Sequence, residues 1–394
     1  MKKLLILGAG VYQVPLIKTA KRLGCYTIVS SIDGNYPGFD IADKVYRINT
    51  VDTDAMMRIA EDEDVDGVVT AGSDVAVVSV GKVCDKLGFK GLSEKAAEIA
   101  SDKLLMKQVY EKYGVNTAKY RKIYLNDQDY EDKLDGLEFP LIFKAIDSSG
   151  SRGITRVDSP DDFDDARESV IQNTKSDHFI VEEFIDGYEF GAQAFVQDGK
   201  IEFILPHGDY VFKGDTGVPV GHYAPFDVSE EQIENIKVEL TKAIKAMELD
   251  NCAINADFIM KDDKVYVLEI GGRSGATCLA ELTSIYYGFD YYEKIVQVAL
   301  GEHADFAPTC APVPNASKLL ISDKSGTISS QTDDNDPYDP DIIDVSFDYN
   351  IGDEIRAFHV GPDRIGQVIT KGETLEQAVE KLDQAMKKIT IAIK

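Results

Sequence analysis

The sequence predicts a protein of the α/β and α+β class, with a parallel α/β domain at one end, a mixed middle and a small α+β subdomain at the other end. Strand and helix patterns alternate through residues 1–95, which is typical of a parallel sheet with crossover helices. Residues 255–273 contain two apolar, β-branched runs around a polar turn, which indicates a hairpin. Residues 354–388 combine two strand-like runs with one amphipathic helix.

The N-terminal domain contains two sharp turns from strand to helix. Gly8-Ala9-Gly10 follows the first strand, but Gln13 stands where the third glycine of a dinucleotide fingerprint is expected. A second turn, residues 70–74, leaves a strand at the same edge. Both turns fit either a structural role or a shared substrate pocket, because helix N-termini attract anions. We expect strands at 4–7, 26–30 and 67–70, a helix with Leu16, Ala20 and Leu23 on one face, and a helix at 75–87.

A helix is predicted to follow Ser101, which we expect to cap it, and to end at Gly114. Lys103 lies in the first turn of this helix, where the helix dipole disfavours a cation. This lysine is therefore either exposed to solvent or placed there for an anion.

The next predicted strand, residues 139–146, carries one charge, Lys144, among apolar neighbours. A loop of small residues, 147–153, follows at once. Such loops let backbone amides approach phosphate oxygens without obstruction by Cβ atoms. The loop lacks the Walker A pattern, so the strand lysine and the loop together indicate a phosphate site of another kind.

A further strand is expected at 179–184, and residues 190–196 and 200–205 are expected to form a hairpin around Asp198-Gly199. Residues 206–225 are predicted to be a long irregular stretch, either disordered or functional, because such loops are uncommon in compact domains. The remaining expected elements are helices at 229–247, within 275–300 and at 375–388, strands at 354–360 and 364–370, and an acidic surface excursion at 322–341.

The hairpin at 255–273 brings two acids together. Asp257 belongs to its first run and Glu269 closes the second, so antiparallel pairing places both carboxylates on one face of the sheet. Hard divalent cations such as Mg²⁺ take one or two carboxylates together with substrate phosphates, and Arg273 adds a cation nearby. Taken alone, these residues favour a surface hairpin with solvated acids, and the rest of the chain reverses that preference.

The composition restricts the partners. Lys and Arg number 42 against 69 Asp and Glu, a formal net charge of −27, and such a field repels nucleic acid and anionic membranes. A phosphorylated ligand must therefore be held by a few basic side chains, backbone amides and metal ions. No apolar run approaches the ~20 residues that cross a bilayer. The five scattered cysteines form no CxxC pair, so we expect reduced thiols and a cytoplasmic protein.

The motifs, in their order and spacing, resemble the ATP-grasp superfamily along the whole chain. The residues that carry the resemblance are Ser101-Asp102-Lys103, Lys144 with the loop after it, VEEFI at 181–185, Asp257, Glu269 and Arg273. The resemblance implies an ATP-grasp fold with a pre-ATP-grasp domain at 1–95, a central domain with an ATP lid at 96–190, a metal-binding and catalytic domain at 191–306 and a biotin-carboxylase-like subdomain at 307–394.

The resemblance also implies roles for individual residues. Lys103 and Lys144 would contact ATP phosphates, Arg273 would steady the transferred phosphoryl group with Lys144, and Asp257 and Glu269 would hold Mg²⁺, with Mn²⁺ as the alternative ion. The loop closing over the phosphates would be Ser148, Ser149, Gly150, Ser151, Arg152 and Gly153. Glu182 and the backbone of Glu183 and Ile185 would hold adenine, and Glu189 would bind ribose. Many relatives have Asn where this chain has Gly271, which leaves one or two metal ions open.

EIGGRSG at 269–275 and the stretch 206–225 look most like the ligases that join amino acids, including L-amino-acid ligases and the ligase of pyrrolysine biosynthesis. We therefore expect a carboxylate-amine ligase that forms an acyl phosphate from ATP, with small carboxylate and amine substrates and a homodimer as a candidate assembly. Two alternatives stay open at this point. One is a bicarbonate-activating carboxylase of the purine-pathway or biotin-carboxylase type, and the other is a nucleotide-binding regulator without turnover.

Overall fold

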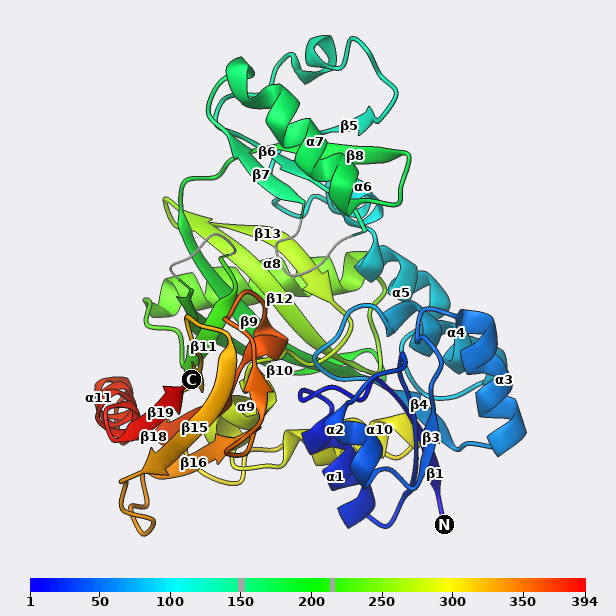
Figure 1. Ribbon diagram of the computed structural model, residues 1–394. Coiled ribbons are helices and arrows are strands. Elements are labelled where there is room, and N and C mark those ends of the chain that lie inside the picture. The colour runs from blue at the N-terminus through cyan, green and yellow to red at the C-terminus, as the bar shows by residue number, and fades with distance from the viewer. Residues whose placement is uncertain (148–152, 213–216) are drawn as a thin grey trace.

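A computed structural model describes residues 1–147, 153–212 and 217–394 (Figure 1). The N-terminal sheet is parallel, with strand order β3-β2-β1-β4, and its two faces are covered by helices. This confirms the predicted parallel α/β domain. Its strands are β1 (Lys3–Leu7), β2 (Tyr26–Ser30), β3 (Lys44–Tyr46) and β4 (Gly67–Val69), and its helices are α1 (Val14–Arg22), α2 (Pro37–Ile41), α3 (Thr53–Glu63) and α4 (Val77–Leu87).

The two predicted turns of this domain touch each other. The side chain of Gln13 accepts a hydrogen bond from the backbone N–H of Gly10 and donates one to the carbonyl of Ala71, at 2.9 and 2.5 Å. A Cβ atom at Gly8 would lie 2.9 Å from the Gln13 side chain, so this glutamine fills the space that a dinucleotide turn leaves open.

Two helices, α5 (Glu94–Ser101) and α6 (Lys103–Tyr113), lead out of the N-terminal domain. The prediction that Ser101 caps the second helix is wrong, because Ser101 is the last residue of α5. Asp102 caps α6 instead, and its carboxylate accepts the N–H groups of Leu104 and Leu105 at 2.8 and 3.0 Å. Aspartate and serine are comparable as caps, so the two adjacent candidates could not be separated by residue type.

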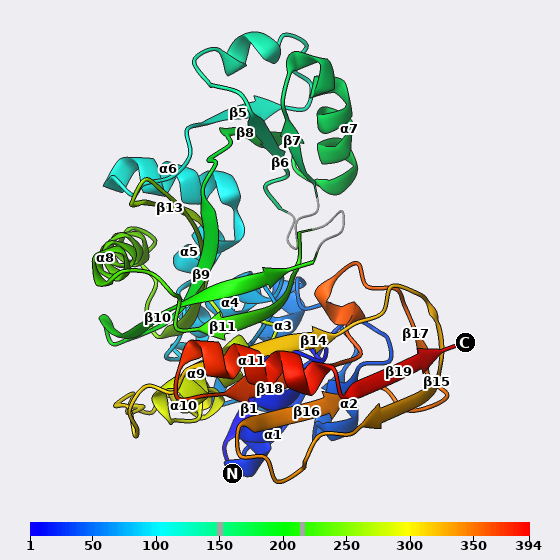
Figure 2. The ribbon, with the colours of Figure 1, turned by 90° about the vertical axis from the view of Figure 1, so that its left-hand side faces the viewer.

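The next unit is a four-stranded antiparallel sheet in the order β5-β8-β6-β7, with α7 packed on it, and it stands at one end of the molecule in both views (Figures 1 and 2). Its elements are β5 (Tyr120–Tyr124), β6 (Leu141–Lys144), β7 (Ile154–Val157), α7 (Phe163–Asn173) and β8 (His178–Glu183), with 3₁₀ turns η1 (Glu131–Leu134) and η2 (Pro160–Asp162). The strand with Lys144 is four residues long, shorter than the predicted 139–146.

An eight-stranded sheet forms the centre, in the order β13-β12-β9-β10-β11-β14-β18-β16. One face of β9, β12 and β13 packs against α5, α6 and α8 around Ile254, Phe258 and Leu240. The strands are β9 (Tyr188–Gln197), β10 (Lys200–Val211), β11 (Pro219–Ala224), β12 (Cys252–Lys261), β13 (Lys264–Gly271), β14 (Asn315–Leu320), β16 (Ile342–Phe347) and β18 (Gly366–Lys371). The helices are α8 (Glu230–Ala246), α9 (Leu279–Tyr287) and α10 (Tyr291–Ala299).

The prediction that 206–225 is irregular is wrong for the residues described there. β10 runs on to Val211 and pairs with β11, with His222 opposite Asp209. The buried side chains of these strands include His207 and His222, so the alternation of apolar and polar residues that marks a half-buried strand is missing.

The C-terminal part adds β15 (Gly326–Asp333), β17 (Glu354–Ile355), β19 (Ile389–Ile393), α11 (Leu375–Met386) and the turn η3 (Gly361–Asp363). The excursion predicted at 322–341 contains β15, which pairs with β17 and β19 in a three-stranded sheet. The polar and acidic composition of residues 322–341 gave no strand pattern from which β15 could be predicted. The domain boundaries proposed at 95, 190 and 306 stay predictions. Among the described residues, no helix combines the length and the apolar character needed to cross a membrane.

Candidate active site

The central feature of the site is a row of four residues that lie directly opposite one another across the eight-stranded sheet. Glu269 on β13 pairs with Asp257 on β12, Asp257 pairs with Gly191 on β9, and Gly191 pairs with His207 on β10. Directly opposed residues of antiparallel strands point to the same face. The prediction of a hairpin that faces Asp257 with Glu269 is therefore confirmed, and His207 projects from the same face.

The hairpin owes its register to its turn. Asp262 and Asp263 both adopt positive φ, 49° and 61°, which is the conformation of a two-residue turn matched to strand twist. A shift of one residue would move both acids to the opposite face, where the apolar core around α8 packs.

The two acids differ in their partners. The Nζ of Lys103, in the first turn of α6, lies 3.0 Å from the Oε1 of Glu269. Asp257 has solvent access, but the protein around it and the nearby carboxylate of Glu269 raise the pKa of Asp257 to about 7. The two carboxylates therefore repel each other, and a bound cation would relieve that repulsion.

Arg273 follows β13 and is held by the N-terminal domain. Its Nε and Nη2 each donate to one carboxylate oxygen of Asp74 at 2.8 Å, a bidentate pair. Burial raises the pKa of Asp74, but the guanidinium outweighs it and holds that pKa below its ordinary value. A Cβ atom at Gly271 would lie 2.9 Å from the Oδ1 of Asp74, so this ion pair occupies the space that a side chain at 271 would need.

Two lysines share one buried glutamate in the four-stranded unit. The carboxylate of Glu182 lies 3.2 Å from the Nζ of Lys107 and 3.0 Å from the Nζ of Lys144. Burial raises the pKa of Glu182, yet the two ammonium groups hold it below its ordinary value. Burial also lowers the pKa of Lys107 to about 8, against the pull of Glu182.

Lys107 was missed from the sequence because it sits among the apolar residues of a helix. One pattern could have revealed it. Lys103 and Lys107 are four residues apart on α6, so they lie on one face of the helix. Lys103 pairs with Glu269 of the hairpin, and Lys107 pairs with the buried Glu182 of the four-stranded unit. This face of α6 therefore lies between the two groups of acids.

The other predicted nucleotide contacts lie at the end of β8 and at the start of β9. Glu183 pairs with Lys119, and its backbone N–H donates to the Lys119 carbonyl at 3.0 Å. Ile185 is half-buried and Glu189 is exposed. Of the predicted lid, Ser148, Ser149, Gly150, Ser151 and Arg152 lie outside the described residues. Gly153 has a φ of +65°, and a Cβ atom there would lie 2.9 Å from that of Ala145, so glycine is required.

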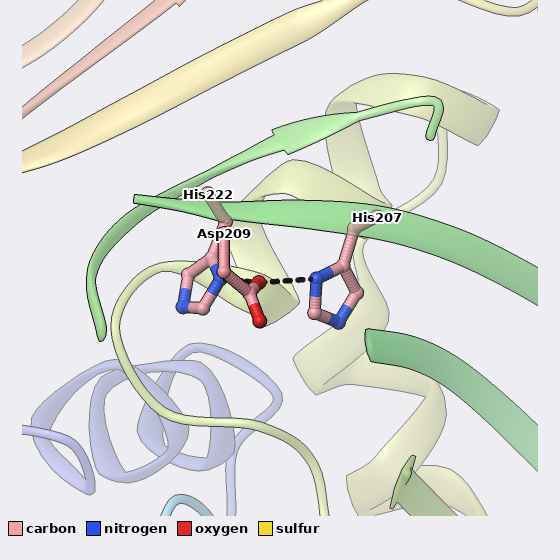
Figure 3. Close-up of side chains that lie close together, drawn as sticks. All are labelled: His207, Asp209 and His222. Atoms are coloured by element: carbon pink, nitrogen blue, oxygen red, sulfur yellow. Dashed lines mark hydrogen bonds and ion pairs between the residues drawn. The ribbon is translucent and has the colours of Figure 1, made fainter. Parts of the chain in front are cut away.

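A further polar group, missed from the sequence, lies beside the row of acids. Figure 3 shows Asp209 pointing between the rings of His207 and His222. Its Oδ1 lies 3.0 Å from the Nδ1 of His207 and 2.6 Å from the Nδ1 of His222. The pairing of β10 with β11 brings these three side chains together, and 206–225 gave no strand pattern from which that pairing could be predicted.

Comparisons with known proteins identify the fold and the family. A model of the ATP-grasp domain matches residues 137–281, and a model of L-amino acid ligase C-terminal domain 2 matches residues 318–394. The crystal structure of phosphoribosylglycinamide synthetase from Anaerococcus prevotii is 39% identical to this chain, with a TM-score of 0.85 and 100% of each chain covered. This chain belongs to the ATP-grasp family.

Other ATP-grasp relatives are more distant. Formate-dependent phosphoribosylglycinamide formyltransferase from Hydrogenovibrio crunogenus is 24% identical over 396 residues, 96% of this chain and 94% of that protein. The L-amino acid ligase from Bacillus licheniformis is 20% identical, has a TM-score of 0.82 and is covered to 99%, with 100% of this chain, which shows a shared fold. The predicted ATP-grasp fold is confirmed, and the chain is an enzyme of the ligase class that forms carbon–nitrogen bonds.

ATP-grasp enzymes use ATP with Mg²⁺, and the residues of this chain fit both. Asp257 and Glu269 offer carboxylate oxygens from directly opposed positions, which is the donor type that Mg²⁺ prefers. Lys103 and Lys144 offer ammonium groups from α6 and β6. Each of these lysines is paired with a carboxylate, so each is already oriented for an anionic ligand.

Proposed function

We propose that this ATP-grasp enzyme is a carboxylate-amine ligase that activates its acid as an acyl phosphate, with cleavage of ATP to ADP and phosphate, and joins an amino acid to an amine or to a second amino acid. The observation that carries the proposal is the opposed pair of Asp257 and Glu269 with Lys103 at 3.0 Å. Acids and a cation in this arrangement suit the transfer of a terminal phosphoryl group.

Each residue has a separate task in this proposal. Asp257 and Glu269 hold Mg²⁺, which when bound neutralises charge on the transferred phosphoryl group. Lys103 and Lys144 bind phosphate oxygens. Arg273 presents its guanidinium in an orientation fixed by Asp74 and stabilises the charge that develops as the acid attacks. Fixed orientation matters because a donor that needs no rearrangement during the reaction stabilises the transition state most.

The comparisons support an amino acid and an amine as the substrates. The matching C-terminal model is that of L-amino acid ligases, and it spans residues 318–394. The 39% identical relative is named as a phosphoribosylglycinamide synthetase. A glycinamide is an amide of the amino acid glycine, so this name also supports ligation of an acid to an amine. We propose that adenine and ribose bind at the end of β8 and the start of β9, near Glu182, Glu183, Ile185 and Glu189. The carboxylate of Glu182 also orients Lys144.

The test is a screen of pairwise amino-acid mixtures for phosphate release with ATP and Mg²⁺, followed by mass spectrometry of the product. The matched control is Glu269→Gln, which removes one carboxylate of the proposed metal site. An amide product with ADP supports the proposal. AMP as a product would instead indicate an adenylating enzyme, and strict dependence on bicarbonate would indicate a carboxylase. ATP binding without turnover under every condition would indicate the regulator.

A further inference from the structure

The cluster of His207, Asp209 and His222 has a defined arrangement of protons. The backbone N–H of Gly275 donates to the Oε1 of Gln193 at 2.8 Å, which fixes the orientation of that amide. The Nε2 of Gln193 is therefore the end that faces the Nε2 of His207, at 3.5 Å. Because an amide nitrogen only donates, the lone pair of His207 lies on Nε2 and its proton lies on Nδ1.

The carboxylate of Asp209 agrees with this assignment. Its Oδ1 lies 3.0 Å from the Nδ1 of His207, so it accepts that proton's hydrogen bond and holds the ring in one tautomer. It accepts a second hydrogen bond from the Nδ1 of His222 at 2.6 Å. A carboxylate behind an imidazole in this way orients the ring and stabilises the imidazolium that forms when the other nitrogen takes a proton.

The edge of the His207 ring that carries Nε2 lies over Gly191, within the row of acids. A Cβ atom at Gly191 would lie 2.6 Å from the Nε2 of His207, so the ring occupies the space that a side chain at 191 would fill. Gly191 lies directly between His207 and Asp257 in the register of the sheet. The absence of a side chain at 191 therefore lets the Nε2 edge of the ring lie over β9, on the side of His207 where β12 carries Asp257.

From this geometry we infer that His207 is the general base that deprotonates the attacking amine, with Asp209 as its positioning residue; this inference rests on the proposed ligase function. An amine that is protonated at neutral pH cannot attack a carbonyl. The amine nitrogen loses a proton to the Nε2 of His207 and forms a bond to the acyl carbon. The bond from that carbon to the phosphate oxygen breaks, and phosphate leaves with the electron pair and takes the second proton that the nitrogen loses as the amide forms.

The charge state of the cluster suits a base. Burial lowers the pKa of His207, and the opposing attraction of Asp209 does not restore it, so the ring is neutral at neutral pH and can accept a proton. The groups that face it are Asp209, His222, Gln193 and, across Gly191, Asp257. A metal ion is the competing occupant, since the three side chains bring their ligand atoms within 4.8 Å of one another. The contacts favour protons, because both Nδ1 atoms are aimed at the same oxygen at hydrogen-bond distance.

The experiment compares two nucleophiles. Hydroxylamine is uncharged at neutral pH and captures an acyl phosphate as a hydroxamate without prior deprotonation, whereas amino acids need a base. Wild type, His207→Gln and the exposed control His303→Gln are incubated with ATP, Mg²⁺ and the pooled amino acids, with and without hydroxylamine. We expect His207→Gln to lower amide formation by ~10²–10⁴-fold and to retain most hydroxamate formation. Retained hydroxamate also shows that the variant is folded.

Several results would overturn the inference. Equal loss of amide and hydroxamate would make His207 a structural residue, and unchanged amide formation would remove it from the reaction. Stoichiometric zinc in the purified wild-type chain would make the cluster a metal site. Nitrogen NMR of wild type should show His207 neutral with its proton on Nδ1, and Asp209→Asn should disturb that tautomer. Wild type that forms no hydroxamate from any acid would refute the ligase function itself.

Discussion

Replacement of Glu182 by glutamine removes the one negative charge that Lys107 and Lys144 share. The three side chains are 3%, 2% and 14% exposed, and the carboxylate lies 3.2 and 3.0 Å from the two ammonium groups. The glutamine keeps the size of the side chain but leaves two ammonium groups without the carboxylate that contacts both of them. Breaking a buried ion pair in this way typically costs about 3–5 kcal/mol.

A cost of about 4 kcal/mol corresponds to a change of roughly 10³-fold in the equilibrium between closed and open forms of the four-stranded unit. Since a chain with several domains does not unfold in one step, hydrogen exchange of peptides from β6, β8 and α6 is the suitable assay. The matched control is the neighbouring residue, Glu183→Gln, whose partner Lys119 is 64% exposed. We expect this surface pair to contribute only about 0–1 kcal/mol.

A second variant tests the cause. Adding Lys107→Met to Glu182→Gln removes one of the two unpaired cations, so we expect the double variant to be more stable than Glu182→Gln alone. Equal hydrogen-exchange rates in Glu182→Gln and Glu183→Gln would refute the reasoning that uncompensated charge dominates. So would a double variant whose loss of stability is the sum of the losses caused by the two single substitutions.

Four further predictions follow from the site. Glu269→Gln should abolish turnover while ATP binding weakens only modestly; activity within about tenfold of wild type in steady-state assays would remove Glu269 from the metal site. An ¹⁸O-labelled carboxylate substrate should transfer label to the released phosphate, and its absence from phosphate by mass spectrometry would argue against an acyl phosphate. Gly191→Ala places a Cβ atom 2.6 Å from the Nε2 of His207, so it should lower amide formation more than hydroxamate formation. Because the pKa of Lys107 falls to about 8 on folding, the unfolded form binds the extra proton above that pH; the protection of α6 amides in hydrogen exchange, corrected for the intrinsic rate at each pH, should therefore rise from pH 8 toward the ordinary lysine pKa of 10.5, and Lys107→Met should lack this rise.

The sequence was sufficient where local chemistry decides the structure. The hairpin of Asp257 and Glu269 was predicted correctly because its apolar alternation and its two-aspartate turn agree on one register. The helix at 229–247 was predicted from its amphipathic pattern, and the structure adds a capping box of Ser229 and Gln232 at its start. In the hairpin and in the helix, the residues whose sequence pattern predicts the element are also the residues whose contacts stabilise it.

The sequence failed where the buried groups are polar. His207, Asp209 and His222 form hydrogen bonds with one another across β10 and β11. The sequence of neither strand indicates that these two strands pair. Lys107 is similar, because its counter-charge lies 75 residues further along the chain at Glu182. Pattern reasoning places apolar residues inside and polar residues outside, so buried polar networks are the features it misses.

The ion pairs of the site explain how a chain of net charge −27 can bind ATP. Lys103 pairs with Glu269, Lys144 with Glu182 and Arg273 with Asp74, so each proposed phosphate-binding cation is oriented by an acid. The first pair differs from the others, because Glu269 is also a proposed metal ligand. A divalent cation that takes the carboxylate of Glu269 weakens the attraction between Glu269 and Lys103, so the ammonium group can interact more strongly with the phosphates that arrive with the metal. Metal and nucleotide should therefore favour each other's binding, and Glu269→Gln should retain ATP because glutamine competes less than a carboxylate with phosphate for Lys103.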